Sequence, residues 1–281
     1  MRGDWFRRHP ALLVAVHAAC FWPVWRWYLQ RLNDGSDEPW AIAALLAAAL
    51  MSWPRHGFRL DARDPLFVVG AVLTLIYAAL APLAPPLVRA MPAMAALACT
   101  WVSVTGSRHR LPAIVGLLLL SIPLISSLQF YAGYPLRIVT AAGATQMLNL
   151  VGFDVARLGT SMSVDGRTVL VDAPCSGVRM LWTGAVLCCV LAAMRHASWR
   201  SMIVALSLVV PVVLFVNAVR AALLFVLETR ATPAPAALHS LVGVTTFVLA
   251  AGLLVWSDAL QGRFRRRSRR PLVRLSASPQ P

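Results

Sequence analysis

Long apolar runs follow one another along the chain, with short polar connections between them. Most of these runs approach the roughly 20 apolar residues that a helix needs to cross a bilayer. The pattern therefore predicts an all-α polytopic membrane protein with about eight transmembrane helices. The predicted spans are residues 11–29, 39–53, 65–83, 86–105, 111–129, 177–194, 201–221 and 238–257.

Composition and charge fit a membrane protein better than a nucleic-acid-binding protein. Hydrophobic residues make up 59% of the 281 residues, whereas charged residues make up 13%. The net charge is +15, but all 26 basic residues are arginines that cluster beside the apolar runs, as topology determinants do. Nucleic-acid binding is therefore not expected, and the arginine-rich C-terminal segment fits attraction to anionic lipid.

The arginine groups predict which connections face the cytoplasm. The positive-inside rule places the arginine-rich connections and both termini inside. The connections at 30–38, 84–86, 130–176 and 228–237 then face outward. The groups that set this orientation are Arg2, Arg7 and Arg8; Arg55, Arg59 and Arg63; Arg108 and Arg110; Arg195 and Arg200; and the cluster at 263–270.

Segment 136–151 also has a helical pattern, but Arg137, Gln146 and Asn149 interrupt its apolar positions. It fits either a helix that lies on the outer surface or a helix tucked into the bundle. Counted as a full span, it would invert the orientation of everything before it. The charges that flank the last three helices would still place Cys175 on the outer side.

The outer loop at 130–176 contains two strand-like runs, 161–164 and 167–171, around the dipeptide Asp165-Gly166. Asp-Gly favours the type I′ turn that joins two antiparallel strands. We therefore expect a short, outward-facing β-hairpin directly before the helix that carries the candidate chemistry.

The tripeptide Cys175-Ser176-Gly177 connects this hairpin to that helix. Ser176 is expected to cap the helix, and a thiol beside a helix N-terminus has its thiolate favoured by unpaired N–H groups and by the macrodipole. An inert, buried cysteine is the alternative reading. A disulfide has no obvious partner, because Cys188 and Cys189 lie about 20 Å along the same helix.

Arg220 and His239 lie on the next two helices and are predicted to reach the same outer surface. An arginine at the edge of a span either snorkels to the headgroups or faces a polar cavity. A thiol, a guanidinium and an imidazole at one surface suggest nucleophilic chemistry on a membrane-bound substrate. No metal or other cofactor is expected, because no histidine or cysteine has a metal-ligand spacing such as His-Glu-x-x-His or Cys-x-x-Cys.

The order of these residues resembles the exosortase/archaeosortase family of integral membrane cysteine proteases and transpeptidases. That family has Cys-Ser-Gly at the start of a span, Asn-x-x-Arg on the next helix and a histidine that opens the following helix. Here these are Cys175-Ser176-Gly177, Asn217-Ala-Val-Arg220 and His239. The resemblance extends over roughly residues 64–257, since the first two spans are too generic to count.

The resemblance implies a multi-pass enzyme of the bacterial inner membrane, with its active site on the outer, periplasmic side. Its partner would be an exported, membrane-anchored protein that ends in a sorting tail of the PEP-CTERM type. Such a tail has a short motif, often Pro-Glu-Pro in bacteria, a transmembrane helix and a basic cluster. The enzyme would cut near the motif.

Residue chemistry then assigns the expected roles. Cys175 attacks the scissile carbonyl and forms a thioacyl intermediate that water or an amine resolves. His239 moves the proton, because its ordinary pKa lies near the operating pH, and Arg220 stabilises the thiolate or the oxyanion. Asn217 orients Arg220 or donates a hydrogen bond. Supporting or structural positions are Ser176, Gly177, Arg179 and Asp172.

Three regions follow along the chain. Residues 1–63 hold the N-terminal spans, residues 64–262 form the exosortase-like membrane core, and residues 263–281 form an arginine-rich, disordered cytoplasmic tail. The sequence does not indicate an oligomeric state.

Two other functional classes compete with this reading. A non-enzymatic transporter or export subunit for polysaccharide or lipid-linked substrates is suggested by the many spans and by Arg26, Arg89 and Arg137. Charges deep in the spans are scarce, however, and no pair of interrupted inverted repeats is evident. An acyl- or glycosyltransferase is expected to have an acidic residue or a second histidine in the outer loops. The available acidic residues there are Asp34, Asp37, Glu38, Asp154, Asp165, Asp172 and Glu228.

Overall fold

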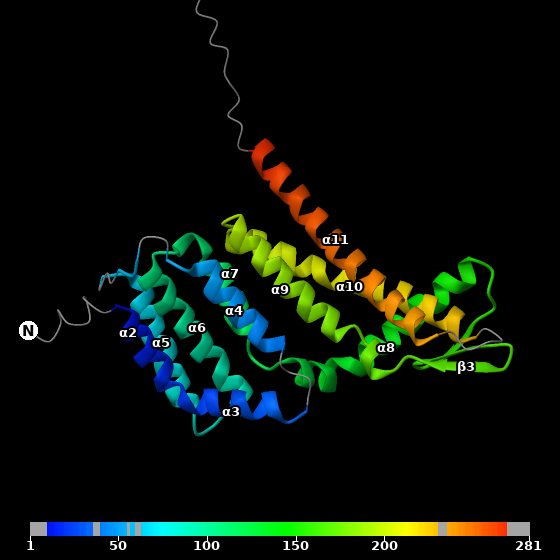
Figure 1. The fold of residues 1–281 in the computed structure, drawn as a ribbon, viewed down its shortest axis with the longest axis horizontal. Helices are drawn as coiled ribbons and strands as arrows, with labels where there is room; N and C mark the ends of the chain where they lie inside the picture. The colour runs from blue at the N-terminus through cyan, green and yellow to red at the C-terminus, as the bar shows by residue number, and fades with distance from the viewer. Residues whose placement is uncertain (1–9, 36–39, 55–56, 60–62, 230–234, 269–281) are drawn as a thin grey trace, which may run out of the picture.

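The computed structural model describes residues 10–35, 40–54, 57–59, 63–229 and 235–268, which are mostly helical (Figure 1). The helices of the first part are α2 (Pro10–Cys20), α3 (Trp22–Asn33), α4 (Trp40–Ser52), α5 (Pro65–Leu80), α6 (Pro86–Thr105) and α7 (Leu111–Leu120). Those of the second part are α8 (Ile125–Leu150), α9 (Val178–Met194), α10 (Trp199–Glu228) and α11 (Ala236–Ser268). The predicted fold class, a mostly helical protein with apolar membrane helices, is thus confirmed.

Four helices in the described residues are long and apolar enough to cross a membrane, namely α6, α9, α10 and α11. The number rises to five if the bent pair of α7 and α8 is one span, and α2, α4 and α5 are apolar but shorter. The predicted count of eight spans is therefore not confirmed. An apolar run does not by itself make one continuous helix.

Two predicted spans are broken in the structure. Run 11–29 divides at Phe21, which is fully buried between α2 and α3 and is followed by Pro23 in the first turn of α3. Run 111–129 divides after Leu120, and the two helices on either side meet at 84°. Proline in the first turn of a helix supports a new start, because its missing N–H has no helical partner there.

The ambiguous segment 136–151 belongs to α8, which packs against α10. Ala141, Ala144 and Leu148 of α8 are buried in one apolar cluster with Ala222 and Phe225 of α10. The side of α8 that bears these small residues thus lets the two helices approach closely. Of the two alternatives, the structure supports a helix tucked into the bundle.

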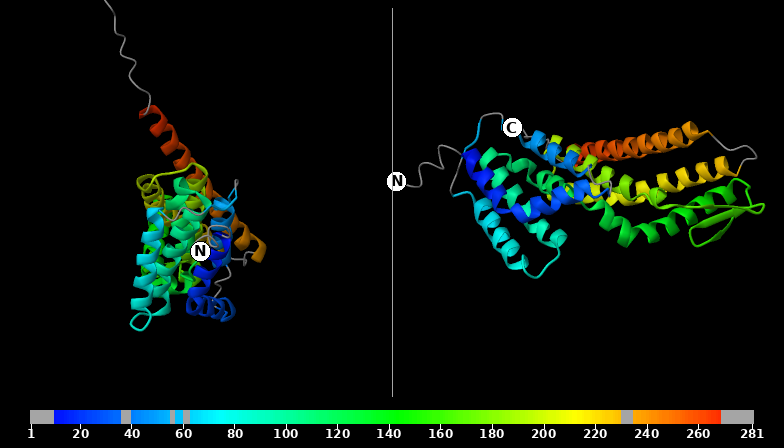
Figure 2. Two further views of the ribbon diagram at one scale, coloured as in Figure 1. Left: turned by 90° about the vertical axis from the view of Figure 1, so that its left-hand side faces the viewer. Right: turned by 60° about the horizontal axis from the view of Figure 1, so that its bottom comes forward.

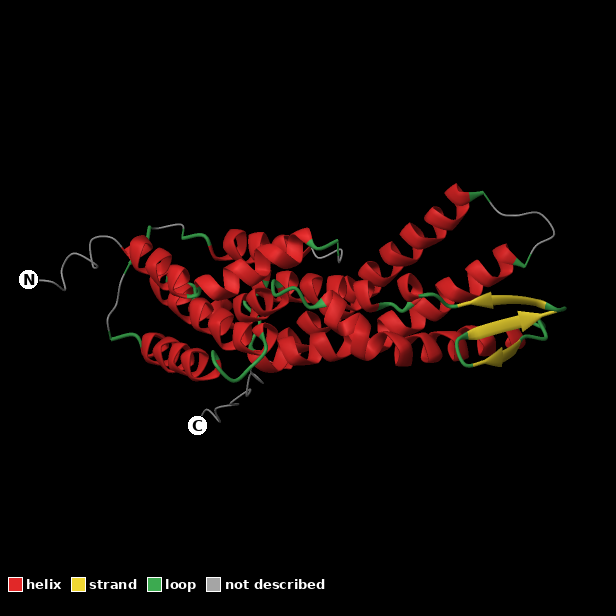
Figure 3. Ribbon diagram, turned by 90° about the horizontal axis from the view of Figure 1, so that it is seen from below, coloured by secondary structure: helices red, strands yellow, loops and turns green. Residues whose placement is uncertain are grey.

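The predicted hairpin is confirmed, with one further strand. Strands β1 (Ala156–Leu158), β2 (Ser161–Val164) and β3 (Arg167–Leu170) form an antiparallel sheet in the order β1-β2-β3 (Figure 3). Asp165 and Gly166 have φ of 49° and 75°, as a type I′ turn requires. Met162 and Val171 bury the inner face of the sheet against Phe225 of α10.

Helix α11 contacts α9 and α10 but is more exposed than either. Gly184 of α9 permits close packing, since a Cβ there would lie 2.9 Å from Val209 of α10 and 3.1 Å from Leu254 of α11. The beginning of α11 stands apart from the end of α10 (Figure 2). The helix continues through Ser268, and the remainder of the predicted tail lies outside the described residues.

At one end of the bundle, two buried carboxylates, Asp64 and Asp258, pair with arginines. We call this region, formed by Asp64, Ser103, Arg108, Arg195 and Asp258, the paired-charge end. Asp64 caps α5 by accepting from the Leu66 N–H, and it also accepts from the Ser103 hydroxyl at 2.6 Å and pairs with Arg108 at 2.8 Å. Arg195, at the end of α9, pairs with Asp258 of α11. Burial raises the pKa of the Asp64 carboxyl, but these donors outweigh it and hold the pKa below its ordinary value.

Candidate active site

The chain turns sharply between β3 and α9, and Cys175 lies in this turn. After Asp172, residues Ala173–Cys175 form one 3₁₀ turn, η2. The Cys175 N–H donates to the Asp172 carbonyl at 2.9 Å, and the Ser176 N–H donates to the Ala173 carbonyl at 3.2 Å. These bonds fix the backbone that presents the thiol, and none of the chain's cysteines, Cys175 included, forms a disulfide.

Gly177, rather than Ser176, occupies the cap position of α9, which corrects the predicted cap. Gly177 has a φ of 83°, in the left-handed region that a side chain disfavours. A Cβ at this position would also lie 3.1 Å from Asn217 Nδ2 and 3.2 Å from Asn217 Cγ. The close approach of Asn217 and the backbone conformation therefore both require glycine.

Ser176 is buried and joins the turn to α8. Its hydroxyl donates to Gln129 Oε1 at 2.8 Å and receives the Val178 N–H at 3.4 Å. The Gln129 side chain donates in return to the Ala173 carbonyl at 3.1 Å. Ser176 thus still contributes to the helix start, but its main contact anchors η2 to α8.

Asn217 holds the cysteine backbone from the opposite side. Its side chain is 1% exposed, and its Nδ2 donates to the Cys175 carbonyl at 2.8 Å and to the Thr140 hydroxyl at 3.0 Å. Its Oδ1 is buried and has no hydrogen-bond partner in the part of the chain that the structure describes. Of the two expected roles for Asn217, hydrogen-bond donation is the one that the geometry shows.

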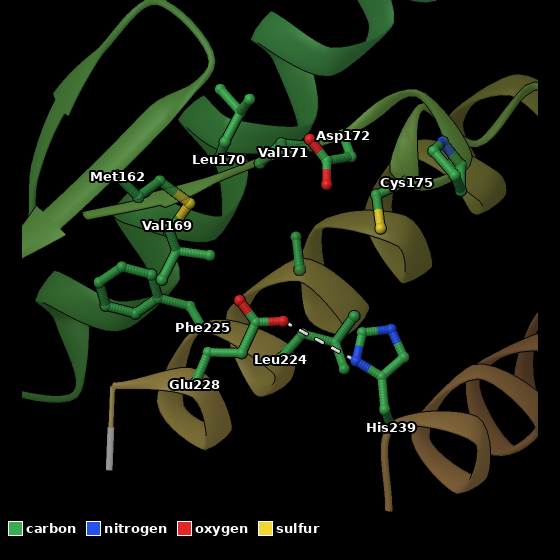
Figure 4. A pocket seen from close by; sticks show the side chains of 12 residues that line it. Met162, Val169, Leu170, Val171, Asp172, Cys175, Leu224, Phe225, Glu228 and His239 are labelled. Atoms are coloured by element: carbon green, nitrogen blue, oxygen red, sulfur yellow. Dashed lines mark ion pairs between the residues drawn. The ribbon is translucent and has the colours of Figure 1, made fainter. Parts of the chain in front are cut away.

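Cys175 and His239 line one pocket of about 160 Å³, which we call the thiol pocket (Figure 4). His239 Nδ1 lies 3.8 Å from Glu228 Oε1, and the side chains of these two residues are 49% and 45% exposed. Both groups are therefore open to water. The lining residues are Met162, Val169, Leu170, Val171, Asp172, Pro174, Cys175, Ala221, Leu224, Phe225, Glu228 and His239.

Arg220 lies beside the thiol pocket rather than in its lining. Burial of the Cys175 thiol raises its pKa above the ordinary value; the Arg220 charge opposes this effect, whereas Asp172 and Glu228 add to it. The thiolate is therefore not favoured overall, contrary to the expectation from the sequence. Its Nε is buried and has no hydrogen-bond partner among the described residues. A Cβ at Gly243 of α11 would lie 3.8 Å from Arg220 Nη2, so the guanidinium rests in van der Waals range of α11.

Arg179 points away from the thiol pocket. It is exposed and lines two neighbouring cavities, of about 520 and 550 Å³. The first also contains Arg220, and the second contains Gln129 and Arg137. The structure therefore places Cys175, Asp172 and His239 in one pocket, with Arg220 next to it, and sets Arg179 on the other side of the turn.

The motifs did not identify three residues that complete this arrangement. Gln129 and Thr140 of α8 support Ser176 and Asn217, and Glu228 pairs with His239. Polar positions in the otherwise apolar pattern of α8 were the available signal for the first two. Glu228 was visible only as one of several acids in outer loops. Among the described residues, no group of three histidine, cysteine or acidic side chains is arranged to hold a metal ion.

Comparison with known protein families finds one that matches most of the chain. The family model described as transmembrane exosortase matches residues 5–256. The match thus includes the N-terminal helices, which carry none of the motif residues. No curated protein and no solved structure gives a significant match. Because the family model covers most of the chain, the protein belongs to the transmembrane exosortase family.

Proposed function

We propose that this protein is a membrane cysteine protease or transpeptidase that cleaves the C-terminal sorting tail of exported proteins. The observation that supports it best is the thiol pocket, in which Cys175, His239 and Glu228 come from three separate segments. Family membership supports the substrate class, a protein with a short motif, an apolar span and a basic cluster at its C-terminus.

The chemistry follows the order of groups around the pocket. The Cys175 sulfur attacks the scissile carbonyl carbon, and the thiol proton passes to His239. The tetrahedral oxyanion collapses, the C–N bond breaks, and His239 returns the proton to the leaving amine. Water or an amine then attacks the thioester, and the thiol is regenerated.

Arg220 and Glu228 stabilise opposite charges in this cycle. Arg220 lies where its guanidinium favours the thiolate, and the same charge stabilises the oxyanion that replaces it. Glu228 faces His239 Nδ1 and stabilises the imidazolium that forms when His239 takes the proton. Asn217 and Gln129 position the turn through its backbone.

The proposed active site faces the outer side of the inner membrane. Helix α9 places Cys175 before its first residue and Arg195 after its last, and 17 residues of helix separate the two ends by about 25 Å. Arginine-rich connections favour the cytoplasm, so Cys175 lies outside. A membrane-impermeant maleimide should label Cys175 in intact spheroplasts of a Cys20→Ala variant; labelling that requires lysis would reverse the orientation.

The test of function uses an exported protein from the same genome that ends in a short motif, one apolar span and several arginines. Co-expressed with the unsubstituted chain, this reporter should lose its tail, as measured by its intact mass. Cys175→Ala should abolish the processing, whereas Cys188→Ala, within α9 and outside the lining of the pocket, should retain it. Full processing by Cys175→Ala at equal protein level would refute the proposal.

A further inference from the structure

Strand β3 is an edge strand with backbone groups that no neighbouring strand uses. In the register of β2 with β3, Met162 faces Val169 and the Val171 N–H donates to the Thr160 carbonyl at 3.0 Å. In an antiparallel pair, the residues that bond to the partner alternate with residues whose N–H and C=O point away from it. The backbone groups of Thr168 and Leu170 therefore point to the open side of β3.

This open edge borders the thiol pocket. Val169, Leu170 and Val171 all line the pocket, although successive side chains of a strand point to opposite faces. Because Met162 of β2 and Phe225 of α10 also line it, the pocket extends from the edge of β3 onto the inner face of the sheet. Leu224 and Glu228 of α10 form the opposite wall, as Figure 4 shows.

The same strand leads directly to the nucleophile. Cys175 follows Leu170 by five positions, through Asp172 and the η2 turn. Cys175 lines the same pocket as Val169, Leu170 and Val171, so a peptide paired along β3 would lie beside the Cys175 thiol. The open edge therefore runs toward the thiol.

The hairpin is held firmly enough to act as a template. Met162 and Val171 are buried against Phe225, and Arg167 Nη1 donates to the Thr229 carbonyl at 2.6 Å. The tip of the hairpin is thus tied to the end of α10, while Leu170 itself stays 51% exposed. An exposed edge of this kind pairs readily with another extended chain.

We propose that the segment of the substrate around its cleavage site binds as a fourth strand along the open edge of β3. The occupant is an extended peptide, because only an extended backbone matches the free N–H and C=O groups and also reaches Cys175. This inference rests on the proposed function and names how that site holds its substrate. Main-chain pairing supplies affinity with little demand on sequence, while alternate side chains enter the pocket.

Leu170→Pro is the test variant, because it removes the outward N–H of Leu170 without removing a β2–β3 hydrogen bond. Proline is tolerated at such edge positions. The matched control is Arg157→Pro on the opposite edge of the sheet. Ala156 and Leu158 of β1 pair with Ser163 and Ser161, so the Arg157 N–H also points outward, but away from the pocket.

Processing of the reporter by full-length variants in membranes is the first measurement. Leu170→Pro should slow processing about ten-fold, as expected for one lost hydrogen bond to a desolvated partner, and Arg157→Pro should stay within about two-fold. Unchanged processing by Leu170→Pro overturns strand addition and leaves the proposed function intact. Processing that persists in both Leu170→Pro and Cys175→Ala overturns both. A loss that accompanies dissociation of a dimer would assign the edge to a second copy and overturn the proposal.

A second measurement does not depend on the folding of any variant. A synthetic peptide chloromethyl ketone that ends at the mapped cleavage site alkylates the Cys175 sulfur with loss of chloride, and intact mass follows its rate. Single N-methyl groups are then placed at successive peptide bonds. Strand addition predicts that every second N-methyl group slows labelling about ten-fold while the intervening ones do not. Equal effects at all positions would contradict it.

Discussion

The two ends of the helix bundle differ in how their charged side chains are partnered. At the paired-charge end, Asp64 is 3% exposed. Its carboxylate accepts hydrogen bonds from the Ser103 hydroxyl and the Leu66 N–H and forms an ion pair with Arg108. At the other end, the Nε atoms of Arg220 and Arg137 are buried without a hydrogen-bond partner among the described residues, and the Arg220 charge acts on the Cys175 thiol. Unpartnered buried groups cost stability. Because the Arg220 charge also acts on Cys175, we expect Arg220 to matter more for the proposed chemistry than Arg137 does.

The largest contrast is expected between two arginines of the thiol side. Arg220→Met should lower the rate of reporter processing about 10²–10³-fold, because removal of one group that stabilises an oxyanion costs that much. Arg137→Met, in the neighbouring cavity with its guanidinium over the Tyr134 ring, should change the rate only a few-fold. Rates are measured at matched protein levels in membranes.

Arg220→Lys sharpens the comparison. Lysine keeps the positive charge but loses the planar, multiple donor geometry, so processing should recover only partly. Equal rates for Arg220→Met and Arg137→Met would mean that Arg220 does not stabilise the thiolate or the oxyanion.

Two glycines with similar backbone strain test the turn at Cys175. Gly177 and Gly166 have φ of 83° and 75°, but only a Cβ at Gly177 meets another side chain, that of Asn217. Gly177→Ala should therefore slow processing about ten-fold or more, while Gly166→Ala should cost only the strain of about 1 kcal/mol in stability. The measurements are processing rate and thermal unfolding of the purified proteins. Similar loss of processing in both variants would contradict a specific Gly177–Asn217 contact.

Local sequence signals predicted the elements whose determinants lie within a few residues. Asp165-Gly166 specifies a turn by its own conformational preference, and Cys175-Ser176-Gly177 marks the start of a helix. The break after Leu120 was missed because hydropathy stays high across it, although Pro123 lies in the gap. Apolar composition indicates that a segment can be buried in a membrane or a protein core. It does not indicate whether the segment forms one continuous helix.

Non-local contacts were beyond the reach of these signals. Ser176 was expected to cap α9, but Asn217 and Gln129, distant in sequence, set the conformation of the turn. Glu228 approaches His239 across a connection between two helices, so no spacing rule identifies the pair. The motif residues could be named from the sequence, whereas the partners that hold them required the fold.

The paired-charge end should govern stability rather than chemistry. Asp64→Ala removes a helix cap and a buried acceptor, and should lower the free energy of unfolding by about 1–3 kcal/mol. Processing by the folded fraction should be unchanged. Chemical denaturation in detergent and the processing rate at permissive temperature check the two statements. A lower processing rate of Asp64→Ala without a loss of stability would show that the paired-charge end also affects the reaction.

The smallest expected effect concerns pH. Because the pKa of Asp64 in the folded protein lies below its ordinary value, its ionised form stabilises the fold above the unfolded pKa. That contribution is lost as pH falls through the folded pKa. Asp64→Asn should therefore flatten the dependence of unfolding free energy on pH on the acid side, measured by denaturation at a series of pH values. An unchanged slope would show that Asp64 is not held ionised.

We expect the Cys175 sulfur to carry the substrate as a thioester during the reaction. The direct measurement is intact and peptide mass spectrometry of the full-length protein, stopped in acid while it processes the reporter. We predict an adduct on Cys175 with the mass of the reporter up to its cleavage site, released by hydroxylamine. Reporter processing with an unmodified Cys175, or an adduct on another residue, would show that Cys175 is not the nucleophile.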